Sequence, residues 1–328
     1  MTHMPIKNNN LRAILNKIIN KKNITKQDSF FLVSRVNIWD LLYGAYIIRE
    51  HFFDNKIHLC SIINAKSGNC SEDCKFCAQS SRHATKIKTY KLVSSKIIKE
   101  AYFKARRNKA DGFSIVTSGN KLSTEEIDRL SNTVHELCSQ NKTPYLCLSV
   151  GRLSPLSIAK LKESGITKCH HNLETSRSFF PKICSTHSYS ERVATIVNLK
   201  KANIKVCSGG IFGLGEGWKD RIDLAFTLKD LNVDSVPLNF LMPAKGTSLD
   251  KLNLLSPMEA LRIIAIFRYI LPDKDIRICA GREKVLRNLQ PLMFYAGATG
   301  MMIGGYLTQP GRGVADDFQM LNDLGVTD

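Results

Sequence analysis

From about residue 57 onward, short β-rich runs alternate with amphipathic helical stretches, and this alternation constrains the fold more than any other feature. Repeated βα units are typical of a parallel sheet. The candidate strands cover residues 58–63, 113–117, 145–149, 166–170, 204–208, 235–240, 276–279 and 301–304. Eight such units predict an α/β fold, a TIM-type (βα)8 barrel, with its active site at the carboxyl ends of the strands.

Helix signals support this division of the chain. Capping boxes at Ser123 to Glu126 and Ser256 to Glu259, and the pair Ser154-Pro155, predict helix starts between the strands. The first fifty-odd residues carry apolar side chains at helical spacing. We therefore expect an N-terminal helical extension over residues 1–55 and a barrel domain over residues 56–328.

Composition narrows the class of protein. The 328 residues carry a formal net charge of +18, but the lysines are spread along the chain, so a biased composition is a better explanation than nucleic-acid binding. The start lacks the apolar core of a signal peptide, and no later run approaches the roughly 18 apolar residues of a membrane helix. Ten scattered cysteines indicate reduced thiols and metal ligation. We expect a soluble cytoplasmic protein that binds neither nucleic acid nor membranes.

Three cysteines, Cys70, Cys74 and Cys77, form a C-x3-C-x2-C run in the loop after the first predicted strand. An iron-sulfur cluster usually takes four cysteines, so three thiolates leave one iron open to another ligand. The alternative is a structural zinc site closed by His83, although the first gap is one residue too long for the usual zinc knuckle. The predicted position at the catalytic rim favours the open cluster.

A second motif, Gly209-x-Ile211-x-Gly213-x-x-Glu216, follows the fifth predicted strand. A dinucleotide-binding loop is the alternative for its glycines, but that motif requires G-x-G-x-x-G at the first strand of its unit. Together with the cysteine run and Phe76 before its last cysteine, the segment resembles the radical S-adenosylmethionine superfamily. The resemblance implies a four-iron four-sulfur cluster whose open iron binds S-adenosylmethionine, and it places Glu174, Gly209, Ile211, Gly213 and Glu216 around that cofactor.

Five segments narrow the resemblance to the biotin synthase family within that superfamily, from about residue 35 to the C-terminus: residues 67–80, 171–176, 205–210, 236–239 and 277–283. The resemblance implies that sulfur is inserted between two unactivated carbons of dethiobiotin. Two 5′-deoxyadenosyl radicals would be consumed, and a second iron-sulfur cluster would supply the sulfur. It also implies a flavodoxin or ferredoxin as electron donor and a homodimer.

The resemblance assigns the remaining site residues one by one. Asn172 and Asn239 match the asparagines that bind the ureido ring of dethiobiotin, and an amide supplies both donors and acceptors for a cyclic urea. Glu174 stands where the family usually has an aspartate that binds the ribose hydroxyls of S-adenosylmethionine.

The second cluster is where the chain departs from the family pattern. Its usual three cysteines and one arginine correspond to Ser114, Cys147, Cys207 and Arg277, and a serine hydroxyl is a poor substitute for a thiolate. Cys279 lies two residues beyond Arg277, so the period of a strand puts both on one face. We hypothesise that Cys147, Cys207 and Cys279 are the thiolate ligands of a variant auxiliary cluster (2Fe-2S or another type), with Arg277 beside them. The alternative is that Cys279 is a small buried apolar residue.

The sequence leaves four other cysteines as core or surface thiols: Cys60, Cys138, Cys169 and Cys184. Two rival functions also stay open. One is another radical enzyme of the same branch, such as a hydrogenase-cofactor or pyrrolysine-pathway protein. The other is a zinc-stabilised nucleic-acid-binding protein.

Overall fold

The computed structural model describes residues 6–140 and 145–326. Within them, one parallel sheet contains nine strands: β1 (His58–Lys66), β2 (Gly112–Thr117), β3 (Tyr145–Ser149), β4 (Lys168–His170), β5 (Lys205–Cys207), β6 (Gly210–Phe212), β7 (Ser235–Phe240), β8 (Asp275–Ile278) and β9 (Gly300–Met302). Each pairing is parallel, as the alternating sequence predicts.

The sheet closes into a barrel because β5 and β6 both pair with β7. They are two segments of the fifth barrel strand, interrupted at Ser208 and Gly209, so the nine segments occupy eight positions. Gly209 passes so close to β7 that an added Cβ would lie 1.9 Å from the carbonyl oxygen of Pro237. The predicted eight-stranded TIM-type barrel is confirmed, and the break is the feature that the sequence did not predict.

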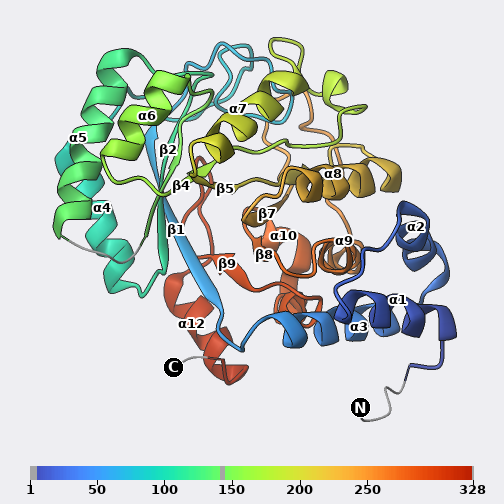
Figure 1. Cartoon of the computed structure of the whole chain (residues 1–328). Helices are drawn as coiled ribbons and strands as arrows, with labels where there is room; N and C mark the ends of the chain where they lie inside the picture. Colours follow the sequence, from blue (N-terminus) through green and yellow to red (C-terminus); the bar gives the residue numbers. More distant parts are fainter. Residues whose placement is uncertain (1–5, 141–144, 327–328) are drawn as a thin grey trace.

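Helices cover the outside of the barrel (Figure 1). They are α4 (Ser95–Arg107), α5 (Thr124–Gln140), α6 (Pro155–Glu163), α7 (Tyr189–Lys201), α8 (Trp218–Asp230), α9 (Pro257–Ile270), α10 (Arg282–Leu286), α11 (Leu292–Tyr295) and α12 (Val314–Asp323). The predicted starts are confirmed, since Ser154 caps α6 and the Ser123 hydroxyl accepts from the Glu126 N–H. Among the described residues, none of the helices has both the length and the apolar character to cross a membrane.

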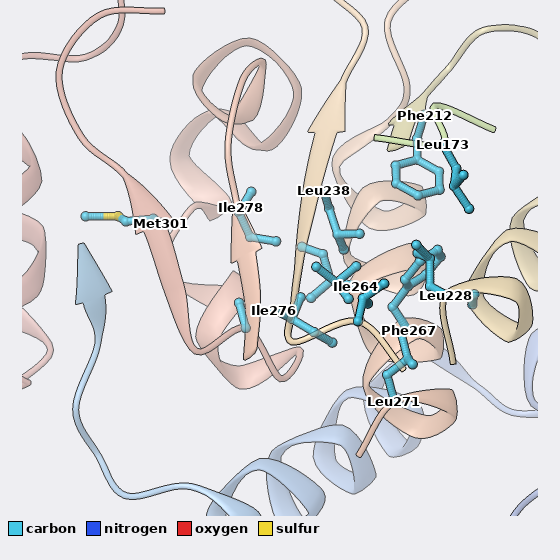
Figure 2. Packing of buried hydrophobic residues seen from close by; sticks show 14 of the residues in the cluster. Leu173, Phe212, Leu228, Leu238, Ile264, Phe267, Leu271, Ile276, Ile278 and Met301 are labelled. Carbon is cyan, nitrogen blue, oxygen red and sulfur yellow. The ribbon is translucent and has the colours of Figure 1, made fainter. Parts of the chain in front are cut away.

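The main core lies between the strands and these helices. Figure 2 shows Leu238 of β7 and Ile276 and Ile278 of β8 beside Ile264 and Phe267 of α9. All five side chains are fully buried. Successive strand residues point to opposite faces, so residue 277 and residue 279 point into the barrel.

The N-terminal region forms three helices, α1 (Asn9–Ile19), α2 (Lys26–Arg35) and α3 (Ile38–Phe52), which confirms its predicted helical character. They lie together near α9 (Figure 1). The hydroxyl of Tyr269 in α9 donates to the carbonyl of Leu41 in α3 at 3.3 Å. This contact fixes the helices against the outside of the barrel, away from its mouth.

Most predicted strand bounds differ from the observed ones by one to three residues. The third and sixth predicted strands coincide with β3 and β7. The first strand continues to Lys66, three residues further than predicted, because Ile63 and Asn64 still pair with β2. The cysteine run therefore lies in the loop that follows Lys66, at the carboxyl edge of the barrel.

Candidate active site

A cavity of about 430 Å³ extends from the carboxyl edge into the barrel. It brings together residues from every strand of the sheet. The residues proposed from the sequence that line it are Cys70, Cys74, Cys77, Cys147, Asn172, Glu174, Cys207, Ile211, Asn239, Arg277 and Cys279. Gly209, Gly213 and Glu216 are not part of its lining.

The cysteine loop is fixed by backbone hydrogen bonds that direct its thiols inward. Cys70 N–H donates to the Gln79 carbonyl at 3.0 Å, and Cys77 N–H donates to the Cys74 carbonyl at 2.9 Å. Burial raises the pKa of Cys77 to about 11. Three sulfur atoms on one folded loop are a donor set suited to an iron-sulfur cluster with one open iron.

His83 is engaged elsewhere, which argues against a zinc site closed by its ring. Its Nδ1 lies 2.9 Å from the Cys77 carbonyl oxygen, and its Nε2 lies 3.4 Å from the Ser248 hydroxyl. Both ring nitrogens therefore have protein partners, whereas a zinc ligand needs one of them free for the metal.

A polar network that the sequence did not reveal lies behind Cys74. Its sulfur is 3.7 Å from that of Cys184, which lies 3.3 Å from Nδ1 of His187. His187 also contacts Glu72 at 2.5 Å, and its Nε2 accepts from Arg192 at 3.0 Å. Cys74, Cys184 and His187 bring ligand atoms within 4.8 Å of one another, and no other group of three or more His, Cys, Asp or Glu side chains does so among the described residues. No local spacing reveals this network, because it forms where residues 183–188 fold over the cysteine loop.

Asn172 and Glu174 follow β4 and hold each other in place. The Asn172 amide donates to Glu174 at 3.2 Å, and its oxygen accepts from Gly209 N–H at 2.9 Å. Glu174 also forms an ion pair with Arg192 at 3.5 Å. Burial raises the pKa of Glu174. The side-chain amide of Asn172 keeps a further donor position on its nitrogen and a further acceptor position on its oxygen for a ligand.

Asn239 of β7 faces Asn172 across the broken fifth strand. Its amide donates to the Gly210 carbonyl at 3.2 Å, and its oxygen accepts from Ala280 N–H at 3.1 Å. The asparagines thus connect four neighbouring barrel strands, β4, the broken β5–β6 strand, β7 and β8, as well as lining the cavity. His170 and His171 lie beside them, and burial lowers the pKa of His170 to about 4, so it is neutral at physiological pH.

The segment after β6 supports the cavity from outside its lining. Glu216 accepts from Leu214 N–H at 2.7 Å and from the Arg221 guanidinium at 2.7 Å. Gly213 and Gly215 have φ values of +94° and +95°, which glycine adopts at low cost. The motif thus fixes the tight turn that follows Ile211, which does line the cavity.

Three buried thiols, Cys147, Cys207 and Cys279, lie deeper in the barrel. Burial raises the pKa of each, so they are thiols in the metal-free chain. Arg277 contacts Asp275 and the hydroxyl of Tyr145 at the floor. Ser114 also lines the cavity.

Cys60 of β1 lines the same cavity rather than the outer core, which corrects its interpretation from sequence. The Arg277 guanidinium donates to its sulfur, and Tyr145 lies 3.7 Å from it. The alternation of side chains along the strand indicates which residues point into the barrel, but the depth of Cys60 depends on the register between strands.

Comparison with known proteins agrees with this arrangement. Residues 65–228 match the Radical SAM superfamily, and residues 237–327 match the Biotin and Thiamin Synthesis associated domain. The biotin synthase of Endomicrobium trichonymphae is 49% identical over 316 residues, covering 96% of this chain and 98% of that protein. The biotin synthase of Geotalea daltonii is 45% identical over 321 residues, covering 97% of each.

The chain belongs to the biotin synthase family. Membership implies a four-iron four-sulfur cluster and S-adenosylmethionine, and the Cys70 loop offers the thiols for the first of these. Solved structures share the fold at lower identity. Methylornithine synthase has a TM-score of 0.80 at 20% identity, covering 95% of this chain and 96% of that one. The FeFe-hydrogenase maturase HydG from Carboxydothermus hydrogenoformans has a TM-score of 0.78 at 16% identity, covering 96% and 78%.

Proposed function

We propose that this chain converts dethiobiotin to biotin, the reaction of the biotin synthase family. Two hydrogen atoms pass from two carbons of dethiobiotin to two 5′-deoxyadenosyl radicals, which become 5′-deoxyadenosine, and one sulfur atom forms a C–S bond to each of these carbons. The observation that carries the proposal is one cavity lined by both the rim cysteines and the deep thiols. A site for radical formation and a site for sulfur would thus open into the same cavity, and bound substrate and cofactor would close it and protect a radical from solvent.

Cys70, Cys74 and Cys77 would hold the four-iron cluster at the rim. When bound, the cluster and S-adenosylmethionine supply a 5′-deoxyadenosyl radical able to remove hydrogen from an unactivated carbon. Glu174 and Ile211 would contact S-adenosylmethionine directly. Gly209, Gly213 and Glu216 would act by shaping the strand and turn around it.

Asn172 and Asn239 would orient dethiobiotin through the amide positions that their backbone contacts leave open. Their fixed amides would present the same donors and acceptors to each substrate molecule. Such positioning matters because the reacting carbons must face the rim while the sulfur source lies below.

Cys147, Cys207 and Cys279, with Arg277, would hold the auxiliary cluster that supplies sulfur. The donor set fits, because soft thiolates bind iron-sulfur clusters and the described residues place these thiols in one buried region. Four cysteines other than the rim three line the cavity, whereas the serine at position 114 cannot replace a thiolate.

We further propose a flavodoxin or ferredoxin as electron donor, a homodimer, and a cytoplasmic location. The net charge of +18 supports an acidic donor. Ten free cysteines support a reducing compartment.

The test is anaerobic incubation of the reconstituted chain with dethiobiotin, S-adenosylmethionine and a reductant. We expect biotin and 5′-deoxyadenosine, and neither product from the Cys70→Ala variant. The matched control is Cys138→Ala, which removes a thiol on α5 outside the cavity. Formation of 5′-deoxyadenosine without biotin would remove the specific function and leave the superfamily.

A further inference from the structure

Cys60 and Arg277 lie side by side at the inner end of the cavity. The Arg277 guanidinium donates to the Cys60 sulfur, and Tyr145 lies beneath both. Cys60 is absent from the ligand set proposed above, which takes Cys147, Cys207 and Arg277 from the family pattern and adds Cys279. The question is therefore whether it shares a level of the barrel with Cys147 and Cys207.

Barrel geometry answers this question. In an eight-stranded barrel with a shear of about eight, side chains at one level come from alternate strands, and the register advances two residues at each alternate strand. The observed pairings can be followed around the whole barrel. The inward residue of each odd-numbered barrel strand lies level with the residue two positions before the inward residue of the next odd-numbered strand. The level pairs are Cys60 with Tyr145, Cys147 with Lys205, Cys207 with Asp275, and Arg277 with His58.

These four offsets are equal, and the fourth returns to Cys60. Cys60, Cys147, Cys207 and Arg277 therefore form one layer, contributed by the first, third, fifth and seventh barrel strands. We call this set the thiol layer. Cys279 lies two residues above Arg277, one level closer to the mouth, and Ser114 belongs to the even-numbered strands that alternate with the layer.

We infer that Cys60 is a thiolate ligand of the auxiliary cluster, in place of the thiolate that Ser114 cannot supply. This inference rests on the proposed sulfur-donor site and deepens it. The thiol layer reproduces three thiolates and one arginine with a different strand supplying the third sulfur. Cys279 adds a further sulfur on the side that faces the substrate.

The inference is tested by iron content without any turnover. A parent variant with Cys70, Cys74 and Cys77 all changed to serine removes the rim ligands, so iron bound after anaerobic reconstitution reports the auxiliary site. Cys60→Ser, Cys147→Ser and Cys138→Ser are then added separately. Iron, acid-labile sulfide and the visible spectrum are measured per chain.

We expect Cys60→Ser to lose more than half of the iron of the parent, as Cys147→Ser does, while Cys138→Ser keeps it. Full iron and an unchanged spectrum in Cys60→Ser would overturn the inference. If the parent variant binds no iron, the proposed auxiliary-cluster site itself is overturned. The biotin assay on the unsubstituted chain tests the proposed function separately, so the two failures are distinguishable.

A second measurement covers the case in which Cys60→Ser does not fold. The unsubstituted chain, with and without reconstituted clusters, is treated with iodoacetamide and analysed by mass spectrometry. Loading should protect Cys60 from alkylation as it protects Cys147, while Cys138 stays reactive. Equal alkylation of Cys60 in both states would contradict its role as a ligand.

Discussion

At the scale of single residues, Glu174 is held in an uncommon state for an acid. Its backbone has a φ of +68°, a conformation that costs a non-glycine residue free energy. Its carboxylate is buried between Asn172 and Arg192. The backbone carbonyl of Glu174 accepts from Ile211 N–H at 2.8 Å, which explains how the conformation is retained. This combination holds the carboxyl group of Glu174 in one position at the wall of the cavity.

Glu174→Gln keeps the size of the side chain and removes its charge. We expect binding of S-adenosylmethionine to weaken about tenfold or more, since a charged hydrogen bond contributes roughly 1.5–3 kcal/mol. Equilibrium binding to the cluster-loaded chain measures it. Glu125→Gln, on the exposed first turn of α5, is the control. Equal affinity for the variant and the parent would exclude a direct role.

At the scale of elements, the break in the fifth barrel strand determines how its two segments, β5 and β6, pair with β7. Ser208 N–H donates to the Ser235 carbonyl of β7, and beyond Gly209 the chain pairs with β7 again further along. Gly209 allows this close approach because it has no side chain.

Gly209→Ala places a Cβ against the carbonyl of Pro237. We expect the variant to lose about 1–3 kcal/mol of unfolding free energy, the usual cost of overpacking. Gly217→Ala is the matched control, because an added Cβ there meets no atom within 4 Å. Chemical denaturation of both variants measures the difference. Equal stability would show that β7 moves freely aside.

The last helix is joined to the barrel by a buried ion pair. Arg282 of α10 contacts Asp317 of α12 at 2.6 Å, and the Asp317 side chain is fully buried. Asp317→Ala removes both short contacts of the buried guanidinium and leaves only Glu283 at 3.8 Å as an ion-pair partner, so we expect a loss of about 3–5 kcal/mol in unfolding free energy. Asp316→Ala changes the exposed neighbouring acid and should leave stability unchanged. Thermal unfolding of the two variants checks this, and equal melting temperatures would contradict it.

Much of this arrangement could be predicted from sequence because it depends on local patterns. Strand alternation predicted the barrel, and cysteine spacing predicted the rim thiols. The thiol layer could not be predicted, since the level of Cys60 depends on pairings among distant strands. The contact of Cys184 with Cys74 likewise requires two loops separated by more than a hundred residues to meet.

At the scale of the whole molecule, charge distribution bears on the electron donor. The loop that carries the rim cysteines also carries the exposed lysines Lys86, Lys88 and Lys91. The excess positive charge would attract an acidic protein toward this edge. The division into an extension over residues 1–55 and a barrel over residues 56–328 stays a prediction.

Reduction of the loaded chain by an acidic flavodoxin or ferredoxin should slow several-fold when salt rises from about 0.01 to 0.1 M, because screening shortens the Debye length. Stopped-flow absorbance measures the rate. A small neutral reductant is the control and should show no such dependence. A salt-independent rate with the protein donor would argue against electrostatic attraction.

The floor beneath the thiol layer has a consequence for the order of events in the cell. Arg277 joins Tyr145 and Asp275 there, and Thr299 donates to Asp275 at 2.6 Å. On the proposed function, fresh iron and sulfide would therefore reach the layer through the mouth, the entrance that dethiobiotin and S-adenosylmethionine would also use. If the thiol layer holds the proposed auxiliary cluster, bound organic ligands would block that path, and the product would have to leave before each renewal of the sulfur.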